Sequence, residues 1–575
     1  MSPTPHATEN RKERAFHSSI PFHPPNEIFV ERTATHENGV EPLVSTNYQT
    51  SPDGPPSALR QSSATTQPTT IGGGGGIRVR GMKNWVRAAL LRVLSAAELL
   101  VSTAVHLGYA FYIFGTAVAA DVAPSLVDGL TAAVGLGGGG GVAKGAAAES
   151  EAEAAAALDG TVPPIVLVHG IFGFGKGVRS LPMLCSPILS LNSTLEKDDH
   201  VLVPDLGSLT SVHDRARELF YYLKGGTVDY GEEHSNEYNH ARYGRTYELG
   251  HYPIWDEDHP VHLVGHSAGA QVIRLLHQML HDGGFDGHVG TSERWVLSVT
   301  SLSGALNGCT RAYIDGVRPE DGWSLRPLCL VQVCRVGSIL YHWLDLPFLN
   351  RYYDFGFGHF AMSRRVVGVA GLAGLLFGSG DRRRRGPFAT GDWILPDLTI
   401  HGAARINARV RTFPSTFYFS YASRRSSGSG GGGGSLGMAG IHPLLLLRAM
   451  QIRRWRYPAG VAPPYEGYRD EDWEDNDGAL NTFSMTHPRI PDEHPSVQVE
   501  EEEEVVGPLR PGVWYYRIVE ADHMTFVINR RRGGVQFDLV YDSIFHNCRR
   551  HVVFRNAPPP PTPTPTPTPT LRNQS

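Results

Sequence analysis

The sequence predicts an α/β fold in which a mostly parallel central sheet is flanked by helices. Residues 164–168 (PIVLV) form a continuous apolar run, which is typical of a strand buried on both faces of a parallel sheet. A second run of β-formers begins at Val261 and leads through a short Gly-Ser turn into a helical pattern at 271–280. A third β-rich run, 514–519, precedes a helix that we expect to begin near Val535.

Composition divides the 575-residue chain into one globular unit and several low-complexity stretches. Stretches rich in Ser, Thr, Pro or Gly cannot bury enough apolar surface to fold, so they predict disorder. The expected order is a disordered arm (1–80), a hydrophobic segment (81–122), a low-complexity linker (123–160), the α/β domain (161–550) and a Pro/Thr-rich tail (551–575). Within the domain we expect disordered insertions near 378–388, 424–436 and 490–508.

The hydrophobic segment contains an uncharged stretch, Leu99–Ala120, that is long enough to cross a bilayer. Basic residues precede it and Asp121 follows it. We expect this segment to associate with a membrane, either as a span or peripherally. The alternative is a helix that packs on the α/β domain, which its small residues, Glu98 and His106 favour.

Charge and cysteine content narrow the function classes. The net charge of −5 is spread over blocks of both signs, which is typical of solvated loops and excludes a nucleic-acid footprint. The five cysteines lack metal-ligand spacing, and their odd number argues against a full disulfide framework. The cysteines predict a reducing, intracellular compartment. Together with the hydrophobic segment, they give the expected location as intracellular and membrane-associated.

The turn after the second strand predicts a catalytic serine. Ser267 lies in Gly-His-Ser-Ala-Gly between a strand and a helix, which is the nucleophile elbow of α/β-hydrolases. Flanking glycines permit the strained backbone and close approach that this turn requires. The glycine-rich loop after the first strand then offers one oxyanion donor at Ile171, and Ala268 offers the second. The alternative is an ordinary strand-loop-helix turn.

A serine nucleophile needs a base and a carboxylate that orients it. His523, in EADHMTF after the third strand, is the candidate base; alternatively it is a loop histidine bonded to Asp522. In this fold the acid lies between serine and histidine along the chain, where Asp397 and Asp477 both qualify. Spacing alone does not choose between them.

Several ordered motifs resemble the thermoalkalophilic bacterial lipase family and its plant lipase-like relatives. They are PIVLVHGIFGFG, GGTVDYGEEHSNEYNHARYGRTY, LVGHSAGAQ, LSVTSLSGALNG, PDLTIHGAARIN, NDGALNTFSM and ADHMTF, and they cover Pro163 to about Arg550. The resemblance implies an α/β-hydrolase that cleaves lipid esters, with acylglycerols as the expected substrates and no organic cofactor. It also implies that the triad acid is the aspartate of the D-L-x-x-x-G-A segment, Asp397, which leaves Asp477 as a loop residue near the site.

The same resemblance implies a zinc site in a small extra subdomain. Asp214, His234 and His240 match its ligands, and a closed set of imidazoles and carboxylates suits a structural zinc. The family's fourth ligand is an aspartate where this chain has Gly358, so we expect the adjacent His359 to substitute.

Two other outcomes remain for the metal site: Asp354 supplies the fourth ligand, or the site is vacant and the histidines are surface residues. The family's calcium site uses acidic residues soon after the catalytic histidine. Thr525 and Arg530–Arg532 occupy that stretch here, so calcium is not expected.

The region between Cys309 and Asp397 is rich in apolar and aromatic residues, as expected of a cap or lid whose apolar face meets lipid. Alternatively, the cap simply packs onto the core. Two alternative functions also remain. One is a catalytically silent, membrane-associated interaction protein, and the other is acyl transfer to an alcohol by the same three residues.

Overall fold

A computed structural model describes residues 162–171, 173, 200–350, 354–377, 386–425, 441, 443–500, 509–526 and 530–555. The predicted arm, the hydrophobic segment with Leu99–Ala120 and the linker lie outside these residues, as does the tail beyond Arg555. Among the described helices, none has both the length and the apolar character that crossing a bilayer requires.

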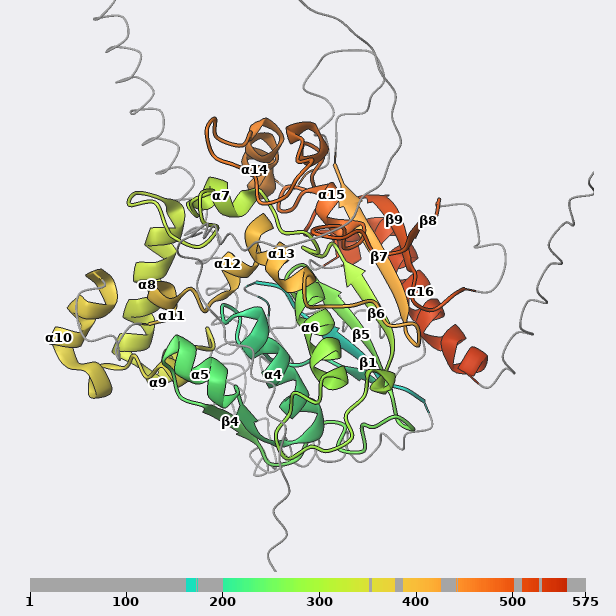
Figure 1. The fold of residues 1–575 in the computed structure, drawn as a ribbon, viewed down its shortest axis with the longest axis horizontal. Helices are drawn as coiled ribbons and strands as arrows, with labels where there is room; N and C mark the ends of the chain where they lie inside the picture. The colour runs from blue at the N-terminus through green and yellow to red at the C-terminus, as the bar shows by residue number, and fades with distance from the viewer. Residues whose placement is uncertain are drawn as a thin grey trace, which may run out of the picture. The chain divides into compact units, whose positions relative to one another are not determined.

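The described residues contain a seven-stranded sheet in which every neighbouring pair is parallel (Figure 1). The predicted α/β fold is confirmed. Its strands, in spatial order, are β2 (Val201–Leu202), β1 (Ile165–Val168), β5 (Val261–His266), β6 (Val296–Leu302), β7 (Phe417–Arg424), β9 (Trp514–Glu520) and β8 (Ser496–Gln498). β8 lies in the stretch 490–508 that the sequence predicts to be disordered. That prediction is wrong for this part, because β8 pairs with β9.

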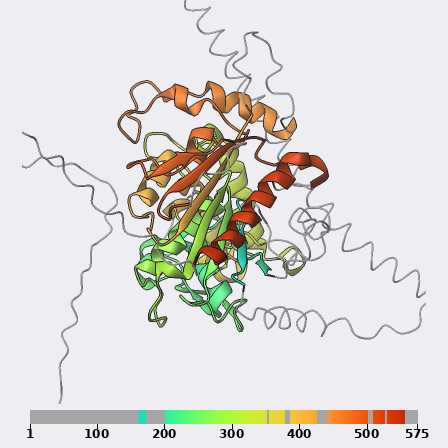
Figure 2. The same ribbon diagram turned by 90° about the vertical axis from the view of Figure 1, so that its right-hand side faces the viewer.

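Helices cover both faces of the sheet, which explains why β1 is apolar throughout. Val166 and Val168 join the larger core with α4 (Val212–Lys224) and α6 (Gly269–His281). Ile165 and Leu167 point the other way, into a second core built with α16 (Arg530–Arg555). Figure 2 shows α16 crossing the sheet on this second face. Alternate side chains of one strand therefore serve two cores.

A small subdomain lies between α4 and β5. Its two strands, β3 (Gly226–Asp229) and β4 (Tyr243–Tyr247), are antiparallel and enclose the short helix α5 (Glu232–Tyr238). This is where the sequence predicts an extra subdomain.

A helical excursion leaves the sheet after β6 and returns before β7; we call it the cap. Its helices are α7 (Arg311–Asp315), α8 (Leu330–Leu344), α9 (Pro347–Asn350), η3 (Phe357–Phe360), α10 (Arg364–Phe377), α11 (Pro387–Thr390), α12 (Ile394–Asp397) and α13 (Ile400–Asn407). In Figure 1, α8 and α10 lie at the side of the domain, beyond α4 and α5. A second insertion, between β7 and β8, contains α14 (Pro443–Arg454), η6 (Asp470–Trp473) and α15 (Thr482–Met485).

Candidate functional site

Ser267 occupies a sharp turn between β5 and α6, as the sequence predicts. Its φ of 56° lies in the left-handed region, which a non-glycine residue adopts at an energetic cost of about 1–3 kcal/mol. Gly265 permits this turn, because a Cβ there would lie 2.5 Å from the backbone of Gly269. Gly269 in turn leaves room for β1, since its own Cβ would lie 2.4 Å from the carbonyl oxygen of Val168. The turn has the backbone geometry of a nucleophile elbow.

The loop after β1 lies directly against the serine. A Cβ on Gly170 would be 2.8 Å from Ser267 Cβ and 3.3 Å from Ser267 Oγ. Ile171 follows Gly170, while Ala268 is the N-cap residue that immediately precedes α6. The two amides predicted as oxyanion donors thus belong to the two segments that meet at Ser267; their role stays a prediction.

His523 is hydrogen-bonded to Asp477. Its Nδ1 lies 2.7 Å from Asp477 Oδ2, and its backbone N–H donates to the carbonyl oxygen of Asp477 at 3.0 Å. Asp477 is fully buried, and its carboxylate has further donors. Oδ1 accepts from the amides of Ala479 and Leu480, at 2.9 and 2.8 Å, and the Ser423 hydroxyl donates to Oδ2 at 2.6 Å. Four donors therefore hold one carboxylate that orients the imidazole.

The prediction that Asp397 orients His523 is wrong. Asp397 ends α12, and its Oδ2 accepts the backbone N–H of Val212 at 2.8 Å, at the first residue of α4. Burial raises the pKa of its carboxyl to about 7. The charge of the nearby Asp392 also raises this pKa, whereas the hydrogen bond from the Val212 amide lowers it. Asp397 therefore caps a helix, and the loop residue Asp477 contacts the histidine instead.

Electrostatics keep Asp477 ionised in spite of its burial. Burial alone would raise its pKa, but His523 and the hydrogen bonds from His523, Leu480 and Ser423 hold the pKa below its ordinary value. This is the charge state that an orienting carboxylate requires.

Two partly buried histidines next to the site have pKa values that favour the neutral imidazole. The ring of His266 lies 4.8 Å from that of His523, and burial, followed by the effect of His523, lowers the pKa of His266 to about 3. Burial and Arg215 likewise lower the pKa of His169 to about 3. Arg215 donates to the carbonyl of His169, and the Leu206 amide donates to its Nε2 at 3.2 Å. Arg215 thus holds the loop after β1 in place. The sequence around this buried helical arginine does not indicate that role.

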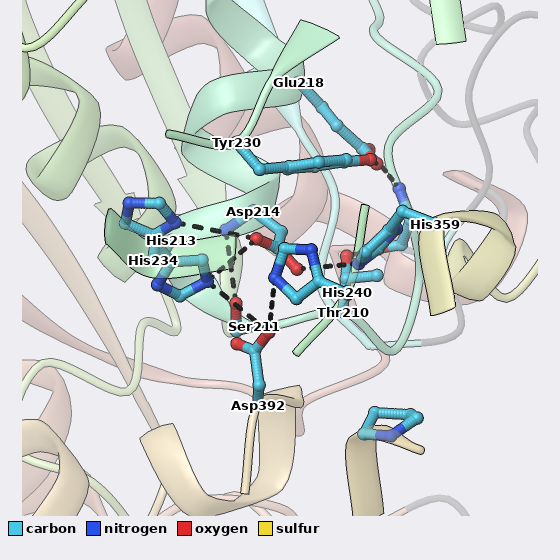
Figure 3. A network of polar contacts seen from close by, with 12 residues as sticks. Thr210, Ser211, His213, Asp214, Glu218, Tyr230, His234, His240, His359 and Asp392 are labelled. Carbon is cyan, nitrogen blue, oxygen red and sulfur yellow. Dashed lines mark hydrogen bonds and ion pairs between the residues drawn. The ribbon is translucent and has the colours of Figure 1, made fainter. Parts of the chain in front are cut away.

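A second polar group lies beside the small subdomain (Figure 3). It consists of Asp214 on α4, His234 on α5, His240 just after α5 and Asp392 just before α12, with ligand atoms all within 4.8 Å of one another. His234 Nε2 lies 3.2 Å from Asp214 Oδ1 and 3.4 Å from Asp392 Oδ2, and His240 Nε2 lies 3.3 Å from Asp392 Oδ2. Four ligands about 2.0–2.1 Å from a tetrahedral zinc are roughly 3.3–3.4 Å apart, so these distances fit such an ion.

The chemistry of the four atoms also fits a cation. Asp214 Oδ1, His234 Nε2, His240 Nε2 and Asp392 Oδ2 are all buried and have no hydrogen-bond partner in the described residues. His240 Nδ1 lies 2.9 Å from the carbonyl oxygen of Ala241, which places the proton of a neutral imidazole on Nδ1 and leaves Nε2 to bind a metal. Buried polar atoms without partners are rare unless an ion or water satisfies them.

The predicted fourth ligand requires a correction. His359 does not belong to the group; its Nε2 instead lies 3.2 Å from Asp214 Oδ2. A Cβ on Gly358 would face open space, so a side chain at that position would point away from the neighbouring residues. Asp392 completes the group. We did not identify it from the sequence, where a single aspartate in Thr-Gly-Asp-Trp carries no ligand-like spacing.

Comparisons with known proteins agree with the fold and the motifs. Residues 161–290 match the family model described as "Lipase-like, C-terminal domain". A lipase of Staphylococcus hyicus is 28% identical over 410 residues, which are 66% of this chain and 56% of the relative. Lipase 1 of Staphylococcus aureus is 35% identical over 173 residues, or 27% of this chain and 25% of the relative. The chain thus spans about half the length of the first of these relatives.

Among solved structures, the crystal structure of Staphylococcus hyicus lipase matches with a TM-score of 0.53 and 25% identity, covering 69% of this chain and 97% of that one. The predicted resemblance to bacterial lipases is confirmed.

Proposed function

We propose that this chain, a relative of the bacterial lipases, hydrolyses carboxylic esters through an acyl-enzyme formed on Ser267. The observation that carries the proposal is the 2.7 Å hydrogen bond between His523 Nδ1 and the buried Asp477, in a domain whose serine has the elbow conformation. This pairing is the one that a serine hydrolase needs to activate its nucleophile.

In the proposed reaction, His523 accepts the proton of Ser267 Oγ as that oxygen attacks the ester carbonyl. Asp477 holds Nδ1–H, which leaves Nε2 as the base, and stabilises the imidazolium that forms. The amides of Ile171 and Ala268 donate to the oxyanion. The proton then passes from His523 to the departing alcohol, and water releases the acyl group by the same route.

We propose lipid esters, in particular acylglycerols, as the substrates. The support is the surface of the cap, where α8 exposes Val336 and Leu340 and α10 exposes Val369 (77%) and Phe377 (80%). The two helices are joined by polar contacts such as Trp343 Nε1 to the carbonyl of Gly368 at 3.0 Å. An apolar surface of this kind suits contact with aggregated lipid.

Activity of the purified chain against p-nitrophenyl esters and emulsified triacylglycerols, compared with Ser267→Ala, tests this proposal. We expect hydrolysis by the wild type and none above background by the variant. Labelling by a fluorophosphonate that depends on Ser267 separates an enzyme from a silent interaction protein. An added alcohol acceptor that diverts the acyl group from water would favour the acyltransferase.

We also propose that Asp214, His234, His240 and Asp392 bind a zinc ion with a structural role. Two imidazoles and two carboxylates suit zinc, and four protein ligands leave no open position for a substrate. When bound, zinc supplies a cross-link between α4, α5 and the segment before α12. Metal analysis of protein never exposed to a chelator should give about one zinc per chain.

A membrane-associated, intracellular location is a further proposal, which rests on the uncharged stretch Leu99–Ala120 and the odd cysteine count. Removal of residues 1–122 should shift the protein from the membrane to the soluble fraction and preserve hydrolysis of a soluble ester. A truncated chain that aggregates or loses all activity would instead support a helix packed on the domain.

A further inference from the structure

The four residues Asp214, His234, His240 and Asp392 are called the metal group below. His359 lies against this group without belonging to it (Figure 3). Its Nε2 is 3.2 Å from Asp214 Oδ2, whereas the other oxygen of the same carboxylate, Oδ1, is 3.2 Å from His234 Nε2. The two oxygens of Asp214 therefore have different partners. Oδ1 accepts no hydrogen bond from the residues that the structure describes and faces the group, while Oδ2 is bonded to His359.

We propose that His359 is a positioning residue of the metal centre, one that donates Nε2–H to Asp214 Oδ2 so that the carboxylate binds the ion through Oδ1 alone. The inference rests on the proposed metal centre and goes beyond its ligand set. Hydrogen bonds to metal-binding carboxylates orient them and tune the affinity of the site.

The surroundings of His359 fix its ring in place. The side chain is buried, and its ring centroid lies 4.3 Å from that of Tyr230 and 4.7 Å from that of His240. The backbone carbonyl of His359 also accepts the N–H of Ala241 at 3.0 Å, next to the ligand His240. The donor is therefore held before an ion binds, which is the condition for preorganisation.

The arrangement also joins the middle of the cap to the metal centre. η3, which contains His359, lies between α9 and α10. It reaches the ligand side chains through this hydrogen bond to Asp214 and through ring packing of His359 and Phe360 on His240. The position that carries the ligand in the resembled family, Gly358, faces open space. In this chain η3 thus supplies a donor to a ligand, and Asp392 supplies the ligand.

Zinc affinity of the metal-free full-length protein, measured by competition with a chromophoric chelator, tests the proposal. We expect His359→Leu to bind zinc ~10–100-fold more weakly than the wild type at unchanged stoichiometry. His359→Gln, whose amide can donate from a similar position, should restore affinity to within about threefold. Phe357→Leu is the matched control, because it loosens the packing of the same short helix against His342 and Phe388 without removing the hydrogen bond; its affinity should not change.

Wild-type affinity in His359→Leu, or equal losses in the Leu and Gln variants, would overturn the positioning role. X-ray absorption of the wild-type zinc protein is independent of whether the variants fold. Two imidazole ligands are expected. Because His213 Nδ1 also lies 3.5 Å from Asp214 Oδ1, a third imidazole would make His359 a ligand, and overturn the proposal, if it is absent from His359→Leu. A wild-type chain that binds no zinc would instead refute the metal centre itself.

Discussion

The serine site and the metal group both contain buried carboxylates, but they satisfy them in opposite ways. Asp477 receives four hydrogen bonds from protein groups, so its charge is fully accommodated without any bound ion. In the metal group, Asp214 Oδ1 lies beside His234, and Asp392 Oδ2 lies beside His234 and His240. Neither oxygen accepts a hydrogen bond from the described part of the chain. In the first site protein groups alone satisfy the carboxylate, whereas the second has the donor atoms of a ligand set.

This difference predicts whether activity or stability is lost when each site is altered. In the proposed reaction Asp477 orients a single imidazole, that of His523. Its loss should therefore remove chemistry and leave the fold intact. The four residues of the proposed metal site come from three separate segments, so loss of a bound ion should weaken the contacts between those segments and leave the chemistry intact. The predictions below test this separation of catalysis from stability.

The largest effect is expected for Asp477→Asn. The amide would no longer stabilise the imidazolium or fix its tautomer, and kcat should fall by about 10⁴-fold with little change in melting temperature. Asp397→Asn is the matched control. Its site raises the carboxyl pKa to about 7, so a neutral amide that still accepts from Val212 should be tolerated and activity should persist. Equal losses in the two variants would contradict the assignment of Asp477.

The two aspartates also mark the limit of what the sequence predicts. The elbow at Ser267 was predictable because strand, glycines and helix are contiguous, and their steric requirements are local. Which acid meets His523 depends on how the insertion between β7 and β8 folds back, and no short pattern around Asp397 or Asp477 encodes that contact. The resemblance selected the wrong one.

The metal group has the same division between local and distant residues. Asp214, His234 and His240 lie within one short segment and are predicted together, whereas Asp392 lies far along the chain, between α11 and α12 of the cap. Its approach depends on backbone contacts such as Ile394 N–H to the carbonyl of Leu209 at 3.0 Å. A ligand brought in by long-range packing has no signature in its own neighbourhood.

The second prediction concerns removal of the metal. Chelation should lower the melting temperature, because an ion that binds only the folded state stabilises it, by about 4 kcal/mol when free zinc is 1,000-fold above its Kd. His234→Ala should reproduce that loss, with turnover of a soluble ester near the wild-type value at moderate temperature. Differential scanning calorimetry and initial rates measure the two effects. A melting temperature that neither chelation nor His234→Ala changes would mean that the histidines bind no structural ion.

The third prediction concerns the fourth ligand. The family that the sequence resembles carries it at the position of Gly358, whereas Asp392 completes the group in this chain. Asp392→Asn should weaken zinc binding by at least about tenfold, since a ligand contributes no less than a residue that merely orients one. Adding Gly358→Asp to this variant should not restore binding, because position 358 faces open space. Zinc affinity of the double variant is measured by chelator competition. Restored affinity would show that the cap can rearrange to the ligand set of the lipase family that the sequence resembles.

The smallest effect is expected for Ser423→Ala, which removes one of the four donors to Asp477. A hydrogen bond to a charged group contributes about 1.5–3 kcal/mol, so kcat should fall by roughly tenfold or somewhat more, far less than in Asp477→Asn. The Ser423 hydroxyl is one of the groups that hold the pKa of Asp477 below its ordinary value. Its removal should therefore raise that pKa, and the acidic limb of the kcat profile should move to higher pH. The pH profile separates this effect from a packing defect, which would lower kcat at all pH values alike. An unshifted acidic limb would mean that the two amides and His523 alone keep Asp477 ionised.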